Sequence, residues 1–232
     1  MVKVSVIIPA FNEEKTILDV LARVRQQHVD GVEFEIVVID DGSKDRTAEL
    51  VESRSDLCDR FIRQPRNGGK GAAVRAGLMA ATGDYVLFQD ADLEYDPNEY
   101  EKLLLPVRKF DADIVMGSRF VAPVYTRVYY FWHKVGNHLI TLAFNLLNNT
   151  TFTDVYSCYL LFRRNLIDPE KLMSDGWEQQ AEILTKAVRA GTMFYEVPIS
   201  YHGRTYAEGK KIRARHAFNV LSMILRCRIM AR

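Results

Sequence analysis

Three carboxylates stand at alternate positions directly after a short apolar run. Asp90, Asp92 and Glu94 follow the residues YVLF in the segment YVLFQDADLE. Like charges this close repel one another, whereas a hard divalent cation such as Mg2+ or Mn2+ takes carboxylate oxygens as ligands. The cluster holds no histidine or cysteine, which disfavours zinc. We interpret the three acids as a site for Mg2+ or Mn2+, with the metal holding a diphosphate.

The elements that would position these acids alternate between strands and helices. Short apolar runs predict strands at 4–8, 34–39 and 85–88, with a further short strand at 60–62. Residues 13–27, 45–52 and 72–81 are predicted helices, the first from apolar residues at helical spacing. This alternation is typical of an α/β fold in which helices cover both faces of a parallel sheet.

Polar clusters follow three of these strands. The segments PAFNEE, DDGS and QDADLE each begin where a predicted strand ends. Ligands of open α/β sheets bind beyond the carboxyl ends of the strands, so we expect the three clusters on one rim. An isolated Asp-x-Asp also occurs at helix caps and turns, and it is the neighbouring clusters that favour a functional role here.

The second half of the chain is less regular. It predicts a strand at 113–116 leading into GSRF, helices at 128–147 and 177–190, and a strand at 194–197. No internal repeat, low-complexity tract or linker interrupts it. We therefore expect residues 1–232 to form a single domain.

Composition and cysteine usage limit the class of protein. Of the 232 residues, 48% are hydrophobic and 26% are charged, which excludes a disordered chain and a multi-span membrane protein. The three cysteines form no CxxC pair, so neither a disulfide framework nor a thiolate zinc site is indicated. With no signal peptide and no apolar stretch of about 20 residues, a cytoplasmic location is expected.

Charge is distributed unevenly along the chain. Seven of the 31 basic residues lie at or after Lys210, whereas all 30 acidic residues lie before it, so residues 1–209 carry a net charge of −6. The end of the chain is thus a positive appendage on an acidic body. Nucleic-acid binding would explain the basic end, but the acidic remainder and the lack of a recognisable nucleic-acid module disfavour it.

Several motifs in a fixed order resemble one family. VSVIIPAFNEE, VVIDDGSKDRTAEL, NGGKGAAVRAG, GDYVLFQDADLEYDP, GSRF, TDVYSCYLLFRR and EVPISYHGRTYAEGKK together resemble family 2 glycosyltransferases. The similarity is greatest to the dolichyl-phosphate mannose synthases and other polyprenyl-phosphate hexosyltransferases. It implies a glycosyltransferase A fold with a Rossmann-like, mostly parallel sheet, together with amphipathic helices at a membrane interface.

The resemblance also implies roles on the donor side. Pro9, Phe11 and Glu13 would line the nucleoside pocket, and Asp41, with Asp40 beside it, would meet the base or ribose. Asp90, Asp92 and Glu94 match the metal-binding stretch of the family. The paired acids of DDGS could instead cap the following helix. NGGKG lacks the spacing of a phosphate-cradling loop, so we favour a turn, with Lys70 as a minor donor-site candidate.

Acceptor-side roles follow in the same way. Arg119 of GSRF matches an arginine that contacts the acceptor phosphate. The family often has a second arginine where this chain has His133, and a serine where it has Asn137. Arg204 and Lys210 match the basic residues of the RTYAEGKK segment, which would fold over both phosphates. His133 taken alone is more typical of aromatic packing.

Asp154 of the TDVYSCY motif leaves two interpretations open. It is either a buried, hydrogen-bonded helix cap or an active-site acid that steers the sugar or the metal. Together with Asp92, Arg119 and Arg204 it completes our predicted catalytic set.

Two segments are candidates for a membrane interface. Within 128–147, apolar residues fall at spacings of three and four, with polar residues on the opposite face and the aromatic run YYFW at the start. Ordinary core packing is the alternative. Residues 210–232 combine the apolar stretch AFNVLSMIL with arginines that would attract anionic lipid.

The predicted reaction is inverting transfer of a hexose from a nucleotide sugar to a polyprenyl or dolichyl phosphate at the cytoplasmic membrane face. GDP-mannose is favoured, and UDP-glucose or another UDP-hexose also fits. An enzyme acting on a soluble sugar or protein acceptor and a catalytically silent nucleotide-sugar binding protein are the alternatives. The sequence leaves the oligomeric state open.

Overall fold

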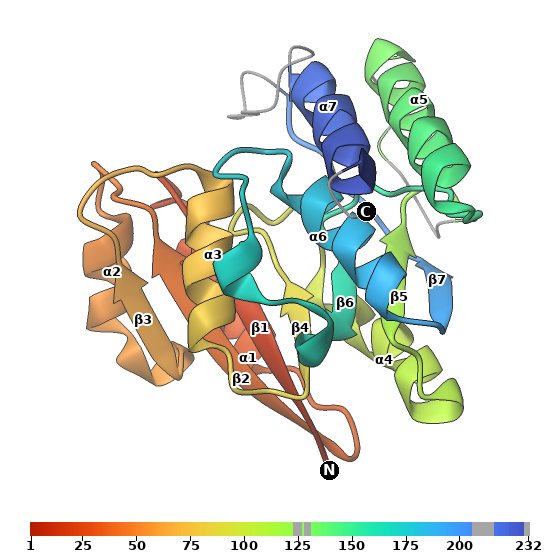
Figure 1. The fold of residues 1–232 in the computed structure, drawn as a ribbon. Coiled ribbons are helices and arrows are strands. Elements are labelled where there is room, and N and C mark those ends of the chain that lie inside the picture. The colour runs from red at the N-terminus through yellow and green to blue at the C-terminus, as the bar shows by residue number, and fades with distance from the viewer. Residues whose placement is uncertain (123–126, 128–130, 206–215, 230–232) are drawn as a thin grey trace.

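A seven-stranded sheet organises the chain (Figure 1). The computed structural model describes residues 1–122, 127, 131–205 and 216–229. The strands are β1 (Val2–Ala10), β2 (Val32–Asp40), β3 (Arg60–Arg63), β4 (Tyr85–Phe88), β5 (Ile114–Ser118), β6 (Leu160–Arg163) and β7 (Phe194–Pro198). The helices are α1 (Ile17–Arg25), α2 (Thr47–Ser53), α3 (Lys70–Ala80), α4 (Tyr100–Phe110), α5 (Phe131–Asn148), α6 (Gln179–Ala190) and α7 (His216–Ile229).

The sheet is mostly parallel, in the order β3-β2-β1-β4-β6-β5-β7. The one exception to the parallel arrangement is β6, which pairs antiparallel with both β4 and β5. Sequence analysis did not predict β6, because a short run such as LLFR, with three apolar residues, is compatible with either strand direction and with a buried helix segment. The sheet is therefore mostly parallel, as the resemblance implied, and β6 is the strand that the sequence pattern did not show.

Helices cover both faces of the sheet, as predicted. Figure 1 shows α3 and α6 in front of the strands, with α1 and α4 behind them. The predicted helices are present, and the largest shift of an end is at α1, which begins at Ile17 instead of residue 13. Residues 128–130 of the helix predicted at 128–147 lie outside the described residues. Helix α4 was not predicted. Its apolar residues Leu103, Leu104 and Val107 are buried against the sheet.

Helix α3 approaches the sheet closely through a glycine. Gly77 lies over β1 and β2, and a Cβ atom added there would lie 2.5 Å from Ile7 Cγ2 and 2.7 Å from Ile39 Cδ1. Both isoleucines are fully buried. Because protein interiors are close-packed, neither neighbour can yield without strain. This contact sets the distance between α3 and the strands, and hence the position of Lys70 at the start of the helix.

Replacing Gly77 with alanine should therefore destabilise the protein by about 1–3 kcal/mol through overpacking. Urea denaturation measures the change. Gly136→Ala is the matched control, because a Cβ atom added to Gly136, within α5, would meet nothing within 4 Å. That change should stabilise by up to about 1 kcal/mol through helix propensity. Equal effects at the two positions would contradict the close approach of α3.

Candidate functional site

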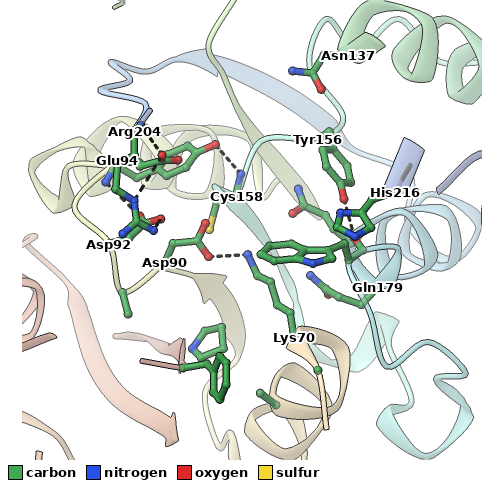
Figure 2. A pocket seen from close by; sticks show the side chains of 18 of the residues that line it. Lys70, Asp90, Asp92, Glu94, Asn137, Tyr156, Cys158, Gln179, Arg204 and His216 are labelled. Atoms are coloured by element: carbon green, nitrogen blue, oxygen red, sulfur yellow. Dashed lines mark hydrogen bonds and ion pairs between the residues drawn. The ribbon is translucent and has the colours of Figure 1, made fainter. Parts of the chain in front are cut away.

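A pocket of about 520 Å³ lies at the carboxyl ends of β1, β2 and β4 (Figure 2). Its wall includes Ala10 at the end of β1, Asp41 directly after β2, and Asp90 shortly after β4. The opposite walls come from α5, α6 and α7. The three polar clusters therefore meet on one rim, as predicted from the parallel strands.

The pocket brings together most of the residues that sequence analysis selected. Those that line it are Pro9, Phe11, Glu13, Asp41, Lys70, Asp90, Asp92, Glu94, Arg119, His133, Asn137 and Arg204. Two others, Asp40 and Asp154, are fully buried and do not line it. Lys210 lies outside the described residues, as do Lys211, Arg213, Arg215 and Arg232 of the basic end.

Arg204 lies among the carboxylates. Its guanidinium donates to Asp92 Oδ2 at 2.6 Å and to the two oxygens of Glu13 at 3.2 and 3.3 Å. Its backbone N–H donates to Glu94 Oε1 at 2.6 Å. The other oxygen of Glu94 accepts from the Tyr201 hydroxyl at 2.8 Å. The carboxylates that follow β1 and β4 thus surround the guanidinium of Arg204, a cation that belongs to the protein itself.

Asp90 pairs with a different cation. Lys70 Nζ lies 2.6 Å from Asp90 Oδ1, and both side chains are largely buried. Burial opposes the charged form of Lys70, but the Asp90 carboxylate outweighs it and raises the pKa of the ammonium. The Lys70 ammonium also lies 5.3 Å from the centre of the Trp177 ring. Lys70 therefore stays charged and joins the acidic side of the pocket to the segment before α6.

Asp92 is the carboxyl group whose ionisation the pocket opposes most. Burial, followed by the charges of Asp90 and Glu94, raises the pKa of Asp92 to about 7, although Arg204 acts in the opposite direction. Additional positive charge near Asp92 would favour the carboxylate. The pocket is therefore suited to a further cation.

The turn that carries the acids is held by a buried glutamine. Gln89, fully buried after β4, accepts hydrogen bonds from the hydroxyls of Tyr100 and Tyr159 at 2.9 and 2.8 Å. Its Nε2 donates to the carbonyl oxygens of Asp90 at 3.0 Å and Tyr95 at 3.4 Å. These hydrogen bonds are buried or partly buried, so Gln89 fixes where the acidic row begins and ends.

The glycines of NGGKG are engaged by protein oxygens. Gly68 N and Gly69 N donate to Asp41 Oδ1 and Oδ2 at 2.8 and 3.0 Å, and Gly71 N donates to the Asp175 carbonyl at 2.8 Å. Gly69 has φ +94°, and a Cβ atom there would overlap the Asp175 carbonyl oxygen. The segment is therefore a tight turn, as we favoured, and its N–H groups do not form a phosphate cradle.

The two acids of DDGS have different environments. Asp41 lines the pocket, where burial raises its pKa despite the two glycine N–H groups. Asp40 turns inward and accepts from Ser43 N at 3.2 Å. Neither side chain caps α2, whose first residue Thr47 bonds instead to Asp45 Oδ1. Of the pair, Asp41 alone lines the pocket.

Arg119 and Asp154 form a buried pair. Arg119 Nε lies 2.7 Å from Asp154 Oδ2, and Nη2 lies 2.8 Å from Oδ1, which is the bidentate geometry of a strong ion pair. Asp154 is fully buried, and its carboxylate raises the pKa of Arg119 against the effect of burial. Asp154 therefore orients Arg119 toward the pocket and has no surface in the pocket itself.

Several wall residues were missed by sequence analysis. Tyr156, Cys158, Trp177, Gln179, Gln180, Tyr201 and His216 all line the pocket. The available signal was the run WEQQ, which places two amides at the start of a helix whose other side chains are largely apolar. Nothing in that run indicates that it lies beside Lys70, more than a hundred residues earlier.

The oxygen-rich rim suits a hard divalent cation. Asp90, Asp92 and Glu94 offer carboxylate oxygens, which are the ligands that Mg2+ and Mn2+ prefer. The Arg204 guanidinium among Glu13, Asp92 and Glu94 shows that positive charge is accommodated there. Within the described ranges, no group of three or more His, Cys, Asp or Glu side chains is already gathered as a metal site. A cation would therefore have to displace the present pairings.

Helices α5 and α7 lie side by side (Figure 1), and both expose apolar side chains. On α5 these are Phe131, Trp132, Leu139, Leu142 and Leu146, and on α7 they are Phe218, Leu225 and Ile229. Trp132 and Leu146 are 77% and 76% exposed. Core packing therefore does not account for the apolar face of α5. In the part of the chain that the structure describes, no helix is both long and apolar enough to span a bilayer.

Comparison with known proteins identifies similar sequences. The family model described as Glycosyl transferase family 2 matches residues 5–169. Over 227 residues the chain is 30% identical to a dolichol-phosphate mannosyltransferase of Pyrococcus furiosus, covering 97% of this chain and 63% of that protein. Over 201 residues it is 32% identical to the low-salt glycan biosynthesis hexosyltransferase Agl6 of Haloferax volcanii, covering 86% and 48%. The chain thus spans about half to two thirds of these relatives.

Solved structures share the fold. A glucosyl-3-phosphoglycerate synthase from Mycobacterium tuberculosis, solved with Mn2+, uridine diphosphate and phosphoglyceric acid, matches with a TM-score of 0.72 and 22% sequence identity. The match covers 98% of this chain and 78% of that one. The predicted fold, with its mostly parallel sheet, is confirmed.

Removing the Asp154 carboxylate should destabilise the folded protein. In Asp154→Ala, Arg119 would keep its charge in a buried place without an opposite charge beside it, which costs about 3–5 kcal/mol. Urea denaturation measures the loss. Asp56→Ala removes the partner of Arg54 in an exposed pair and should change stability little. If Asp154→Ala is as mild as Asp56→Ala, Asp154 does not hold Arg119 in solution.

Proposed function

The chain belongs to glycosyl transferase family 2 and is a glycosyltransferase; on that premise we propose that it transfers a hexose from a nucleotide sugar to a polyprenyl phosphate. GDP-mannose is the favoured donor, with UDP-glucose or another UDP-hexose as the alternative. The protein would act as a peripheral enzyme on the cytoplasmic face of a membrane. One observation carries the acceptor assignment: α5 contributes both to the pocket and to the exposed apolar surface.

On the donor side, the residues at the carboxyl ends of β1 and β2 would hold the nucleoside. Pro9, Phe11 and Asp41 line one end of the pocket, where an apolar edge and a carboxylate suit a base and a ribose. Asp90, Asp92 and Glu94 would hold Mg2+ or Mn2+, which when bound supplies positive charge to the leaving diphosphate. The solved structure with Mn2+ and uridine diphosphate supports this arrangement by its fold.

On the acceptor side, Arg119 would position the attacking phosphate. Its ion pair with Asp154 holds the guanidinium at the pocket wall, and Tyr201 lies against it at 5.1 Å from the ring centre. Because a phosphate monoester is already anionic near neutral pH, no strong general base is needed. Orientation of the two substrates and electrostatic stabilisation would account for catalysis. Arg204 lies next to Asp92. It would leave the carboxylates and bind the phosphates of the substrates.

The lipid would reach the pocket along α5. His133 and Asn137 line the pocket, and Leu139 and Leu142 of the same helix are exposed to solvent. Trp132 both lines the pocket and is largely exposed. Exposed apolar groups of this size mark surfaces that bind a partner or a membrane. On α7, the exposed Arg226 and Arg228 would attract anionic lipid. The name of the Pyrococcus furiosus relative is consistent with a dolichyl phosphate acceptor.

A soluble acceptor is the second candidate. The Mycobacterium tuberculosis enzyme of the same fold was solved with phosphoglyceric acid, a small phosphorylated acid. A pocket that holds one phosphate through Arg119 could hold that of a small molecule in the same way. The exposed apolar face of α5 and α7 would then have no part in catalysis.

Incubation with Mn2+, a short polyprenyl phosphate and a panel of nucleotide sugars tests the proposal. Mass spectrometry should find a polyprenyl phosphohexose with one donor and little with the others. Parallel reactions that contain phosphoglyceric acid or simple sugars in place of the lipid should give no product. Transfer to a soluble acceptor alone would favour the second candidate, and binding of donors without any transfer would indicate a silent protein.

The affinity for Mn2+ should rise with pH through about 7. Because the pKa of Asp92 is raised to about 7, the free protein loses stability as pH rises and Asp92 ionises, whereas a metal binds only the ionised carboxylate. Below pH 7, affinity should fall by up to about tenfold per pH unit for this one proton.

Free Mn2+, measured by electron paramagnetic resonance at pH 6, 7 and 8, reports this affinity without requiring turnover. Asp92→Asn should abolish both the binding and its pH dependence. Glu101→Gln removes an exposed acid of α4 and should behave like the parent protein. An affinity that is flat between pH 6 and 8 would show that Asp92 is not a ligand or is already ionised.

A further inference from the structure

Gln179 carries a buried side-chain amide that is not hydrogen-bonded to any part of the chain that the structure describes. The residue is 3% exposed, lines the pocket, and has an unpartnered Oε1. Its backbone N–H donates to the Gly176 carbonyl at 3.4 Å. A glutamine amide offers two donors and an acceptor, and buried amides are normally paired. The amide therefore lacks a partner that the pocket would have to supply.

The neighbouring buried amides are satisfied, which makes Gln179 the exception among them. Gln180 donates to the Ser157 carbonyl. Gln89 makes four hydrogen bonds with surrounding groups. Leaving a buried amide unpaired destabilises the folded protein, because the amide loses its hydrogen bonds to water and gains none in return. A methionine or leucine would pack the same wall without that penalty, so stability alone does not account for glutamine at this position.

Gln179 lies across Lys70 from the acids, as Figure 2 shows. Lys70 bonds to Asp90 and extends toward Trp177, which stands two residues before Gln179. The Trp177 carbonyl accepts from the Tyr156 hydroxyl at 2.9 Å, and the Tyr156 carbonyl accepts from Arg119 Nη2 at 3.2 Å. The wall that carries Gln179 is thus connected to both the acids and Arg119.

The chemistry of this wall selects among possible partners. A phosphate would be held by the cations elsewhere in the pocket, and a metal ion by the carboxylates. A neutral amide carries no full charge with which to bind either of them. A hydroxyl both donates and accepts hydrogen bonds, as the amide does. Trp177 and Tyr156 provide aromatic surface on the same wall. An apolar wall with one placed polar group is typical of small-molecule recognition.

We propose that Gln179 binds a hydroxyl of the donor's hexose and thereby selects the sugar. The assignment rests on the proposed function, in which the hexose passes from a diphosphate near Asp92 to a phosphate held by Arg119. Because the hexose must contact both phosphates during transfer, it lies against the wall that joins their binding residues. A site built to bond a hydroxyl rejects a sugar that lacks it, since the buried amide then stays unpaired.

Gln179→Met tests this with a side chain of similar length that cannot bond the hydroxyl. The dissociation constants of GDP and GDP-mannose, or of UDP and UDP-glucose, are measured by calorimetry with Mn2+, using the pair that the parent binds. The variant should bind the nucleoside diphosphate within about twofold of the parent and the nucleotide sugar about tenfold more weakly, the worth of one hydrogen bond. Gln26→Met, an exposed change directly after α1, is the control.

Monodeoxy donors give a sharper readout. One deoxy position should weaken binding to the parent by about tenfold and to Gln179→Met not at all, because the lost hydroxyl and the lost amide belong to one hydrogen bond. The free variant should also melt at the same temperature as the parent or higher, because an unpaired buried amide has been replaced by an apolar group. This second measurement separates loss of sugar binding from loss of folding.

Three results would overturn the assignment. The first is an unchanged nucleotide-sugar affinity in Gln179→Met, or a deoxy series that loses affinity equally in parent and variant. The second is a lower melting temperature of the free variant, which would mean that the amide is satisfied within the fold. The third is a parent protein that binds no nucleotide sugar. Of the three results, only this one would also contradict the proposed function.

Discussion

Repulsion among carboxylates is the physical constraint on which the pocket depends. Glu13, Asp92 and Glu94 come from two strand ends and would repel one another in a largely buried place. Arg204 balances them by contacting all three, and Lys70 balances Asp90. These pairings connect the acidic rim to the segment that follows β7 and to α3. The charges on the rim therefore determine where two distant parts of the chain are placed.

Uncharged contacts also help to position the residues of the rim. Gln89 closes the acidic turn with buried hydrogen bonds, and Gly77 lets α3 approach the sheet so that Lys70 reaches Asp90. The Asp175 carbonyl presses against Gly69 and Gly71 and keeps the start of α3 against the loop before α6. Rim residues are thus held in place by polar partners that do not themselves line the pocket, as Asp154 holds Arg119.

Sequence analysis could predict those features that follow from local pattern. Parallel strands share a carboxyl edge, so PAFNEE, DDGS and QDADLE could be placed together from their positions in the chain alone. Pairings across long separations had no such signal: Arg204 meets Asp92 across 112 residues, and Trp177 meets Lys70 across about a hundred. The antiparallel direction of β6 was also hidden, because a short apolar run has the same pattern in either strand direction.

Arg204 makes the rim a site of exchange. While the Arg204 guanidinium is bonded to Glu13 and Asp92, these carboxylates are neutralised by a charge of the protein itself. An added cation can bind them fully only when Arg204 moves away. The two events are coupled by thermodynamic reciprocity: whatever binds Arg204 away from the acids tightens cation binding by the same factor by which the cation tightens the binding of that ligand. A phosphate that attracts Arg204 would therefore act as a positive effector of the rim, without touching it.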